Sequence, residues 1–387
     1  MKIPADAKFS PGLTRTSLAK EIGKRFPTRN IDRPLLLSAV LLSVVGILMI
    51  YSATRADTPS TYYLKRQTMY FILAILFMGL SAGFDYRKII PYAKLIYAAA
   101  IFLLLLVFLF HPRSGAYRWI PFGFFDVQPS ELAKLATIIM LATFSSDHNM
   151  DLGANKDFLR AIVIPLVPML LILLEPDLGT ALVIFVVFVG MALVSGARAR
   201  QMALLGAGTV ASVAAGIFLH IFKSYQIDRL LVFIKPDIDP FGSGYNLLQS
   251  KIAIGSGQFL GRGLFHGTQT NLKFIPEHHT DFIFSVVGEE LGFIGAAFVL
   301  ALFALLLWRT LKIASGAKDA FGTMLAVGIL VMFFFQVLVN VGMTLGLMPV
   351  TGITLPFLSY GGTSLVVNFV CIGLLLNIGA RRFPQQA

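Results

Sequence analysis

The sequence predicts an all-α integral membrane protein, because it is very apolar, poor in charge and divided into long hydrophobic runs. Hydrophobic residues make up 56% of the 387 residues, charged residues only 13%, and the mean hydropathy is +0.78. A soluble domain carries about 25% charged residues, so lipid must cover much of this surface. Cys371 is the single cysteine, so an intramolecular disulfide is excluded. It lies in an apolar run, which predicts a buried thiol.

Ten apolar segments are candidates for spanning helices, each of which needs about 20 mostly apolar residues. The fifth and sixth are separated only by Glu175-Pro176-Asp177. We predict two helices here, because a proline between two acids does not continue a helix in hydrocarbon. The ten segments are 34–54, 67–84, 93–110, 129–146, 160–175, 178–195, 201–222, 282–308, 320–346 and 356–380.

Loop charges orient these helices. With a cytoplasmic N-terminus, the short inner segments hold 20 Lys and Arg residues and the short outer loops hold 5. This asymmetry places both termini in the cytoplasm. The predicted organisation is a basic cytoplasmic tail (1–33), a polytopic transmembrane domain (34–380) and a second cytoplasmic tail (381–387). The net charge of +12 follows from this orientation, and nothing favours nucleic acid.

One long extracytoplasmic loop, 223–282, joins the seventh and eighth segments. It is glycine-rich and contains an amphipathic run from Tyr245 to Ile254. Leu247, Leu248 and Ile252 share an apolar stripe at helical spacing, which predicts a short helix lying on or dipping into the outer membrane surface.

Ionisable residues gather where this loop turns into the eighth segment. They are Glu277, His278, His279, Asp281, Glu289 and Glu290. We expect Thr280 to cap the helix and Asp281 to lie in its first turn, where the helix dipole favours a carboxylate. Glu289 and Glu290 point to different faces two turns deeper, which predicts polar surroundings on both sides. The adjacent histidines match no familiar zinc spacing.

Further charged residues lie near the predicted outer ends of other helices. Glu131 and Lys134 share a helix face and fit either an ion pair or the wall of a polar cavity. Arg118 beside Trp119 fits either a phosphate contact or an interfacial anchor. Asp177 is expected to stabilise the start of the sixth helix.

The stretch from Asn340 to Ser364 is rich in Gly, Pro, Ser and Thr, which occur where a transmembrane backbone unwinds to line a cavity. Close packing of small residues is the alternative. It contains Gly346-Leu-Met-Pro-Val-Thr-Gly352 and Leu358-Ser-Tyr-Gly-Gly-Thr-Ser364.

These two motifs, with Pro276-Glu-His-His-Thr-Asp281 and Gln128-Pro-Ser-Glu-Leu-Ala-Lys134, resemble the signature of the SEDS family (shape, elongation, division and sporulation proteins). The resemblance covers residues 30–382 and the number of helices. Gly267-Thr-Gln-Thr270 is similar to the elongation (RodA) type rather than the division (FtsW) type. Thr354 departs from the proline that many relatives have there.

The resemblance implies a peptidoglycan glycosyltransferase that polymerises lipid II, the membrane-anchored disaccharide-pentapeptide, during cell elongation and rod-shape maintenance. A sugar 4-hydroxyl displaces undecaprenyl diphosphate from C1 with inversion, which needs one base and cationic help for the leaving group. Asp281 matches the essential aspartate of the family. It is thus implied to be the base, or to hold the acceptor hydroxyl through a divalent cation, Mg²⁺ or Mn²⁺.

The resemblance also implies a substrate-binding cavity. Arg118, Glu131 and Lys134 match its positions and are assigned to the headgroup and the diphosphate, with the two cations offsetting leaving-group charge. The remaining assigned wall residues are His279, Glu289, Glu290 and Ser359.

The implied partner is a class B penicillin-binding protein, a single-pass transpeptidase, with the apolar outer faces of the eighth and ninth helices as candidate contacts. The implied location is the bacterial cytoplasmic (inner) membrane, among lipid II and other membrane lipids, with the site on the outer side. A lipid II flippase and a non-enzymatic scaffold of the wall-synthesis complex are the alternatives. The polar cluster lies at the outer face rather than the midplane, which favours the enzyme.

Overall fold

The protein is a bundle of long helices in the computed structural model, which describes residues 31–55, 61–111, 116–123, 125–219, 232–233, 239, 242–272 and 279–382. The long helices are α2 (Arg33–Thr54), α3 (Tyr62–Gly83), α4 (Ala93–Leu106), α5 (Pro129–Asp147), α6 (Asn155–Leu174), α7 (Leu178–Val194), α8 (Ala199–Phe218), α10 (Ser243–Gly257), α12 (Ile283–Ser315), α13 (Ala320–Thr344) and α14 (Gly362–Ala380). The short elements are η2 (Tyr86–Tyr92), η3 (Val107–Leu109), α11 (Thr268–Asn271), β1 (Ile120–Pro121) and β2 (Asp126–Val127).

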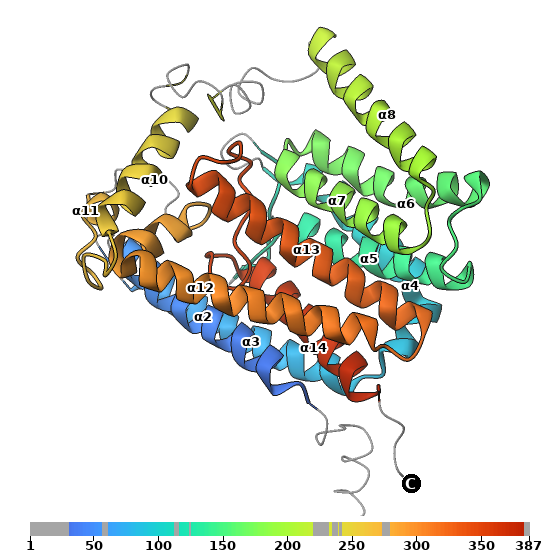
Figure 1. Ribbon diagram of the computed structural model, residues 1–387, viewed down its shortest axis with the longest axis horizontal. Helices are drawn as coiled ribbons and strands as arrows, with labels where there is room; N and C mark the ends of the chain where they lie inside the picture. Colours follow the sequence, from blue (N-terminus) through green and yellow to red (C-terminus); the bar gives the residue numbers. More distant parts are fainter. Residues whose placement is uncertain are drawn as a thin grey trace, which may run out of the picture.

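The helices form two groups that α13 joins (Figure 1). In the first group α3 packs against α14 and α2 packs against α12. In the second, α5 contacts α4, α6 and α7. Helix α13 touches α12 on one side and α5 and α7 on the other. Helix α8 projects from the second group, and only 11% of its most apolar 18-residue stretch is buried.

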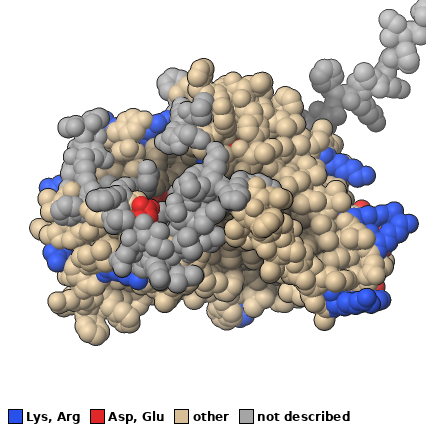
Figure 2. Space-filling model, turned by 90° about the horizontal axis from the view of Figure 1, so that it is seen from above, with Lys and Arg blue, Asp and Glu red and all other residues tan. Residues whose placement is uncertain are grey.

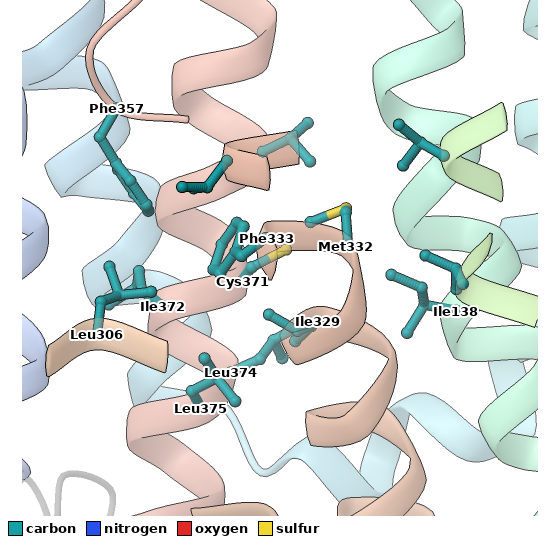
Figure 3. Close-up of a cluster of buried hydrophobic side chains, with 14 of the residues drawn as sticks. Ile138, Leu306, Ile329, Met332, Phe333, Phe357, Cys371, Ile372, Leu374 and Leu375 are labelled. Carbon is teal, nitrogen blue, oxygen red and sulfur yellow. The ribbon is translucent and has the colours of Figure 1, made fainter. Parts of the chain in front are cut away.

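The core between α12, α13 and α14 is apolar and closely packed (Figure 3). Phe333, Cys371 and Ile372 are fully buried, and the rings of Phe333 and Phe357 meet edge to face at 5.4 Å. The prediction of a buried thiol at Cys371 is confirmed. Because lipid is as apolar as these side chains, close van der Waals packing is what stabilises such contacts within a membrane.

Each of the ten predicted segments corresponds to helix in the described part of the chain, but not all of them qualify as spans. Among the described residues, eight helices are long and apolar enough to cross a membrane by length and composition. Helix α7 is shorter, with 17 residues, and α5 carries Glu131 and Lys134 and is not among the eight. The exact count of ten spans, and the sides on which the termini lie, stay predictions.

Several predicted boundaries and loops can be compared with the structure. Helix α10 extends the predicted 245–254 helix at both ends, so the helix is confirmed, while its position at the outer membrane surface stays a prediction. The predicted last segment, 356–380, begins six residues too early, since the backbone before Gly362 is irregular. Residues 1–30 of the first tail, 22 residues of the 223–282 loop and residues 383–387 of the last tail lie outside the described residues.

A kink divides α12 into two parts at Gly292, which has φ 65° and ψ −160°. The loop that follows α10 runs beside the kink: the Phe293 N–H donates to the Gln258 carbonyl (2.9 Å), and the Arg262 N–H donates to the Glu289 carbonyl (3.0 Å). A Cβ atom at Gly292 would lie 2.3 Å from the Gly261 nitrogen. Glycine is therefore required here both by the positive φ and by the close backbone approach.

The two ends of the bundle differ in chemistry. At one end, ion pairs join Arg87 to Asp319 (2.9 Å) and Arg381 to Asp85 (3.2 Å). We call this the basic end, and Figure 2 shows Lys and Arg gathered most densely at one end of the molecule. We call the other end, with the β1–β2 hairpin and the segments just before α12 and α14, the site end. There Thr363 bonds to the Asp126 carbonyl (3.0 Å) and the Gln128 N–H (3.1 Å), which ties the hairpin to α14.

Candidate active site

A turn at residues 279–282 precedes α12 and carries Asp281, which is partly exposed. Three hydrogen bonds fix its carbonyls, from the Asn340 side chain to Asp281 (2.8 Å), from the Ser359 hydroxyl to Thr280 (2.6 Å) and from the Tyr360 N–H to His279 (2.9 Å). The donors come from α13 and from the segment before α14. The backbone of the turn is thus held by rigid neighbours, and a site residue so supported keeps its position.

The start of α12 differs from the prediction. The helix begins at Ile283 with Phe282 as its N-cap residue, and no side chain caps it. The prediction that Thr280 caps this helix is wrong, because the Thr280 carbonyl is held by Ser359 in an irregular turn. Asp281 therefore lies before the helix rather than in its first turn.

Asn340 and Ser359 also stabilise the unwound backbone after α13. Asn340 donates to the Ile353 carbonyl (2.8 Å), and the Ser359 hydroxyl accepts from the Leu355 N–H (2.8 Å). Unwinding between Thr344 and Gly362 was predicted from composition and is confirmed. The Ser359 hydroxyl bonds backbone groups of Leu355 and Thr280, and the assignment of Ser359 to substrate binding stays a prediction.

Gln67 of α3 is a member of this frame that the sequence analysis missed. It is 1% exposed, and its amide bonds the Ser359 carbonyl and the Gly361 N–H, both at 3.4 Å. A polar side chain within an apolar span was the available signal, since such residues need a reason to be buried in a membrane.

Three rings from three segments meet beside the turn. Ring centroids are 4.7 Å apart for Tyr63 and His279, 5.1 Å for Tyr63 and Tyr360, and 5.6 Å for His279 and Tyr360. We call these residues the ring triad. His279, assigned from sequence to the cavity wall, is thus placed two residues from Asp281 with its ring against two tyrosines.

Glu131 and Lys134 form a buried ion pair. The Lys134 Nζ lies 2.8 Å from Glu131 Oε1, and the side chains are only 2% and 5% exposed. This confirms the ion-pair interpretation, while the binding of a headgroup by these residues stays a prediction. The described structure gives the second Glu131 oxygen no hydrogen-bond partner.

Other buried oxygens share this property, namely those of the Gln336, Asn340 and Asn368 amides. They belong to α13 and α14, which contact each other and α5. Buried polar atoms normally have partners, and an exception indicates a place for water, an ion or a ligand. These three amides are therefore candidate polar contacts for water or a ligand.

Arg118 lies against the turn that joins α6 to α7. It donates to the carbonyls of Glu175 (3.5 Å) and Pro176. Asp177 caps α7, accepting from the Thr180 N–H (3.2 Å), so the predicted break between the fifth and sixth segments is confirmed. Glu175 is 0% exposed, and neither carboxylate oxygen has a hydrogen-bond partner among the described residues. Contact of Arg118 with a diphosphate stays a prediction.

Glu289 and Glu290 are both fully buried and hold one loop. Glu289 accepts from the Gln269 N–H (2.8 Å), and Glu290 accepts from the Phe265 N–H (3.2 Å) and from the Ser52 hydroxyl. Both carboxylates thus have polar partners, as predicted for the two faces, and the loop after α10 supplies a partner to each of them. Their assignment to substrate binding stays a prediction.

Comparison with known proteins agrees with this architecture. Residues 33–383 match the model of the FtsW, RodA and SpoVE family of cell cycle proteins. Stage V sporulation protein E of Bacillus subtilis is 39% identical over 90% of this chain and 96% of its own length. Peptidoglycan glycosyltransferase MrdB of Escherichia coli K12 is 37% identical over 91% of this chain and 94% of its own.

Solved structures show the same fold. A chain from a study of how a peptidoglycan synthase complex coordinates polymerization and crosslinking aligns with a TM-score of 0.78, at 30% identity over 91% of this chain and 98% of its own. The rod shape determining protein RodA of Thermus thermophilus aligns with a TM-score of 0.69, at 29% identity over 92% of this chain and 98% of its own.

The apolar helices define an integral membrane protein that carries a polar site at one end of its bundle. The matches are more specific: the chain belongs to the FtsW, RodA and SpoVE family, the SEDS family, and is a peptidoglycan glycosyltransferase.

Proposed function

We propose that this enzyme polymerises lipid II into glycan strands during cell elongation, with Asp281 as the base. The observation that carries the proposal is the fixed turn at 279–281, whose backbone is held by Asn340, Ser359 and Tyr360. Such a frame suits a carboxylate that must lie within hydrogen-bond reach of one hydroxyl. The elongation type is supported by Gly267-Thr-Gln-Thr270.

The proposed step is a single displacement. The acceptor 4-oxygen forms a bond to C1 of the donor sugar as the bond from C1 to the diphosphate oxygen breaks. The hydroxyl proton passes to Asp281, and the electron pair leaves with undecaprenyl diphosphate. An α-linked diphosphate becomes a β-1,4 bond, so no covalent enzyme intermediate is required.

Cations stabilise the charge that grows on the leaving diphosphate. Arg118 and Lys134 are the residues assigned to this role. Both are engaged in the described structure, Arg118 with carbonyls and Lys134 with Glu131. A bound diphosphate would compete with Glu131 for Lys134 and would replace the carbonyl contacts of Arg118, because hydrogen bonds from a cation to a charged phosphate are stronger than those to a neutral carbonyl.

A divalent cation, Mg²⁺ or Mn²⁺, at Asp281 is part of the proposal. Among the described residues, no group of three or more His, Cys, Asp or Glu side chains is placed to hold a metal. One carboxylate with substrate oxygens and water nevertheless suits Mg²⁺, which is often bound through one or two carboxylates and substrate phosphates. When bound, the ion would supply Lewis-acid stabilisation of charge.

The proposed location is the bacterial inner membrane, with the site end outside and the basic end in the cytoplasm. The bias of Lys and Arg toward the basic end supports this orientation. The proposed partner is a class B penicillin-binding protein. Its proposed contact is the apolar face that includes Phe293 and Phe298 of α12 and Phe334 of α13, which are 64%, 51% and 52% exposed.

The test is polymer formation from lipid II by purified protein with its partner. Asp281→Asn is expected to abolish polymer while keeping the thermal unfolding temperature, because it keeps the shape and removes the base. Asp147→Asn is the control, since Asp147 is exposed at the C-terminal end of α5, away from Glu131 in the first turn of that helix. Full activity of Asp281→Asn contradicts the assignment. Lipid II flipping in liposomes without polymer from the wild type favours the flippase, and neither activity favours a scaffold.

A further inference from the structure

The ring triad of Tyr63, His279 and Tyr360 has no role in the step described above, yet it lies beside Asp281. All three residues keep part of their surface exposed. Tyr70 lies further along α3 and is only 5% exposed. It packs against Gly362, where an added Cβ would come within 2.8 Å of the Tyr70 ring. Tyr70 thus fills the contact between α3 and α14, whereas the three residues of the triad stay partly exposed at the site end.

Hydrogen bonds already join the segments that carry the triad. The Tyr360 backbone N–H donates to the His279 carbonyl (2.9 Å), and the Ser359 hydroxyl donates to the Thr280 carbonyl (2.6 Å). The Gln67 side chain of α3 donates to the Ser359 carbonyl (3.4 Å). These contacts fix the turn without aromatic rings. The hydrogen-bonded frame therefore does not need the aromatic side chains of these partly exposed residues.

A pyranose ring has one face made of C–H groups with slight positive charge. The face of an aromatic ring carries negative potential, so such a sugar face packs flat on it. The polar tips of tyrosine and histidine can meet sugar hydroxyls at the rim. Since His279 lies two residues from Asp281, at most about 7 Å along the chain, a sugar on the triad lies within reach of the base.

We propose that the ring triad is the sugar-binding surface that holds the acceptor ring beside Asp281, with Tyr63 as its central substrate-binding residue. Tyr63 contacts both other rings at the two shortest distances in the triad. This inference rests on the proposed function at Asp281 and adds the part of the substrate that is recognised, which is the sugar rather than the lipid or the diphosphate.

The test compares Tyr63→Leu with Tyr63→Phe in the polymerisation assay. Leucine keeps apolar volume and loses the aromatic face, whereas phenylalanine keeps the face and loses the hydroxyl. Tyr63→Leu is expected to raise the KM for lipid II about three- to tenfold, with kcat within about twofold, from the usual strength of one aromatic contact. Tyr63→Phe is expected to raise the KM less than Tyr63→Leu does, because it keeps the aromatic face. Tyr92→Leu, at a tyrosine that is 58% exposed near the basic end, is the matched control.

Inhibition by undecaprenyl diphosphate, which has no sugar, separates recognition from general damage. The inhibition constant is expected to be unchanged in Tyr63→Leu. An equal rise in this constant and in KM, or a fall in kcat at unchanged KM, would overturn the proposal and make the triad a structural contact. Unchanged KM in Tyr63→Leu would also overturn it. Activity of Asp281→Asn, measured in parallel, decides the proposed base separately from the KM of Tyr63→Leu.

Discussion

Asp281 and Glu175 are both carboxylates at the site end, but their surroundings differ. Asp281 lies on a partly exposed turn whose backbone is hydrogen-bonded. Glu175 is fully buried in the turn between α6 and α7, outside the spanning helices. Burial, and to a lesser extent Asp177, raises the pKa of Glu175 from 4.5 to about 8, while Arg118 opposes the rise. The sequence predicted the cap at Asp177 but not this buried acid, because burial depends on helices remote in sequence.

This difference predicts how stability depends on pH. Between pH 4.5 and about 8 the folded protein keeps a proton on Glu175 that the unfolded chain has lost. The stabilising contribution of this residue is therefore full below its unfolded pKa and is lost as pH rises through about 8. Glu175→Gln stays neutral, so it should unfold at a higher temperature than wild type at about pH 9 and at a similar one at about pH 5.

Thermal unfolding in detergent across this pH range measures the effect. Asp147→Asn, which changes an exposed carboxylate, should keep the wild-type slope. Parallel slopes for wild type and Glu175→Gln would contradict the buried, protonated state of Glu175.

At the scale of elements, hydropathy located the helices because each span is a local, continuous pattern. It failed where one backbone packs on another. The loop after α10 runs along the kink in α12 and holds Glu289 and Glu290, and this arrangement depends on glycines that allow the close approach. Gly261 and Gly292 are 31 residues apart in the sequence. No period or spacing reports a contact of that range, so the sequence did not predict that this loop binds the two glutamates.

The kink gives a prediction of its own. Gly292→Ala is expected to destabilise the protein by about 1–3 kcal/mol, because alanine at φ 65° is strained and its Cβ would press on Gly261. Gly206→Ala in α8 is the control, since its Cβ meets nothing within 4 Å and alanine favours a helix interior by about 1 kcal/mol. Thermal unfolding should therefore move in opposite directions for the two variants. An unchanged or raised unfolding temperature of Gly292→Ala would show that the kink does not need glycine.

For the molecule as a whole, the difference in charge between the two ends of the bundle is what supports the proposed orientation in the membrane. Ion pairs such as Arg87 with Asp319 lie at the basic end, and Asp281 lies at the site end. The charge count from the sequence anticipated this separation, because the rule depends only on which loops carry Lys and Arg. The frame around Asp281 was less predictable, since Gln67 is remote in sequence from the 340–364 stretch that supplies Asn340 and Ser359.

The orientation is tested by labelling single cysteines with a membrane-impermeant maleimide. Cys371 is fully buried and should not react, so it need not be replaced. His266→Cys, exposed at the site end, should be labelled in intact spheroplasts. Ser315→Cys, exposed at the end of α12, should be labelled only after permeabilisation, because the basic end then faces the cytoplasm. The reverse pattern would place Asp281 on the cytoplasmic side, where it would have no access to lipid II on the outer surface, and would overturn both the orientation and the proposed reaction.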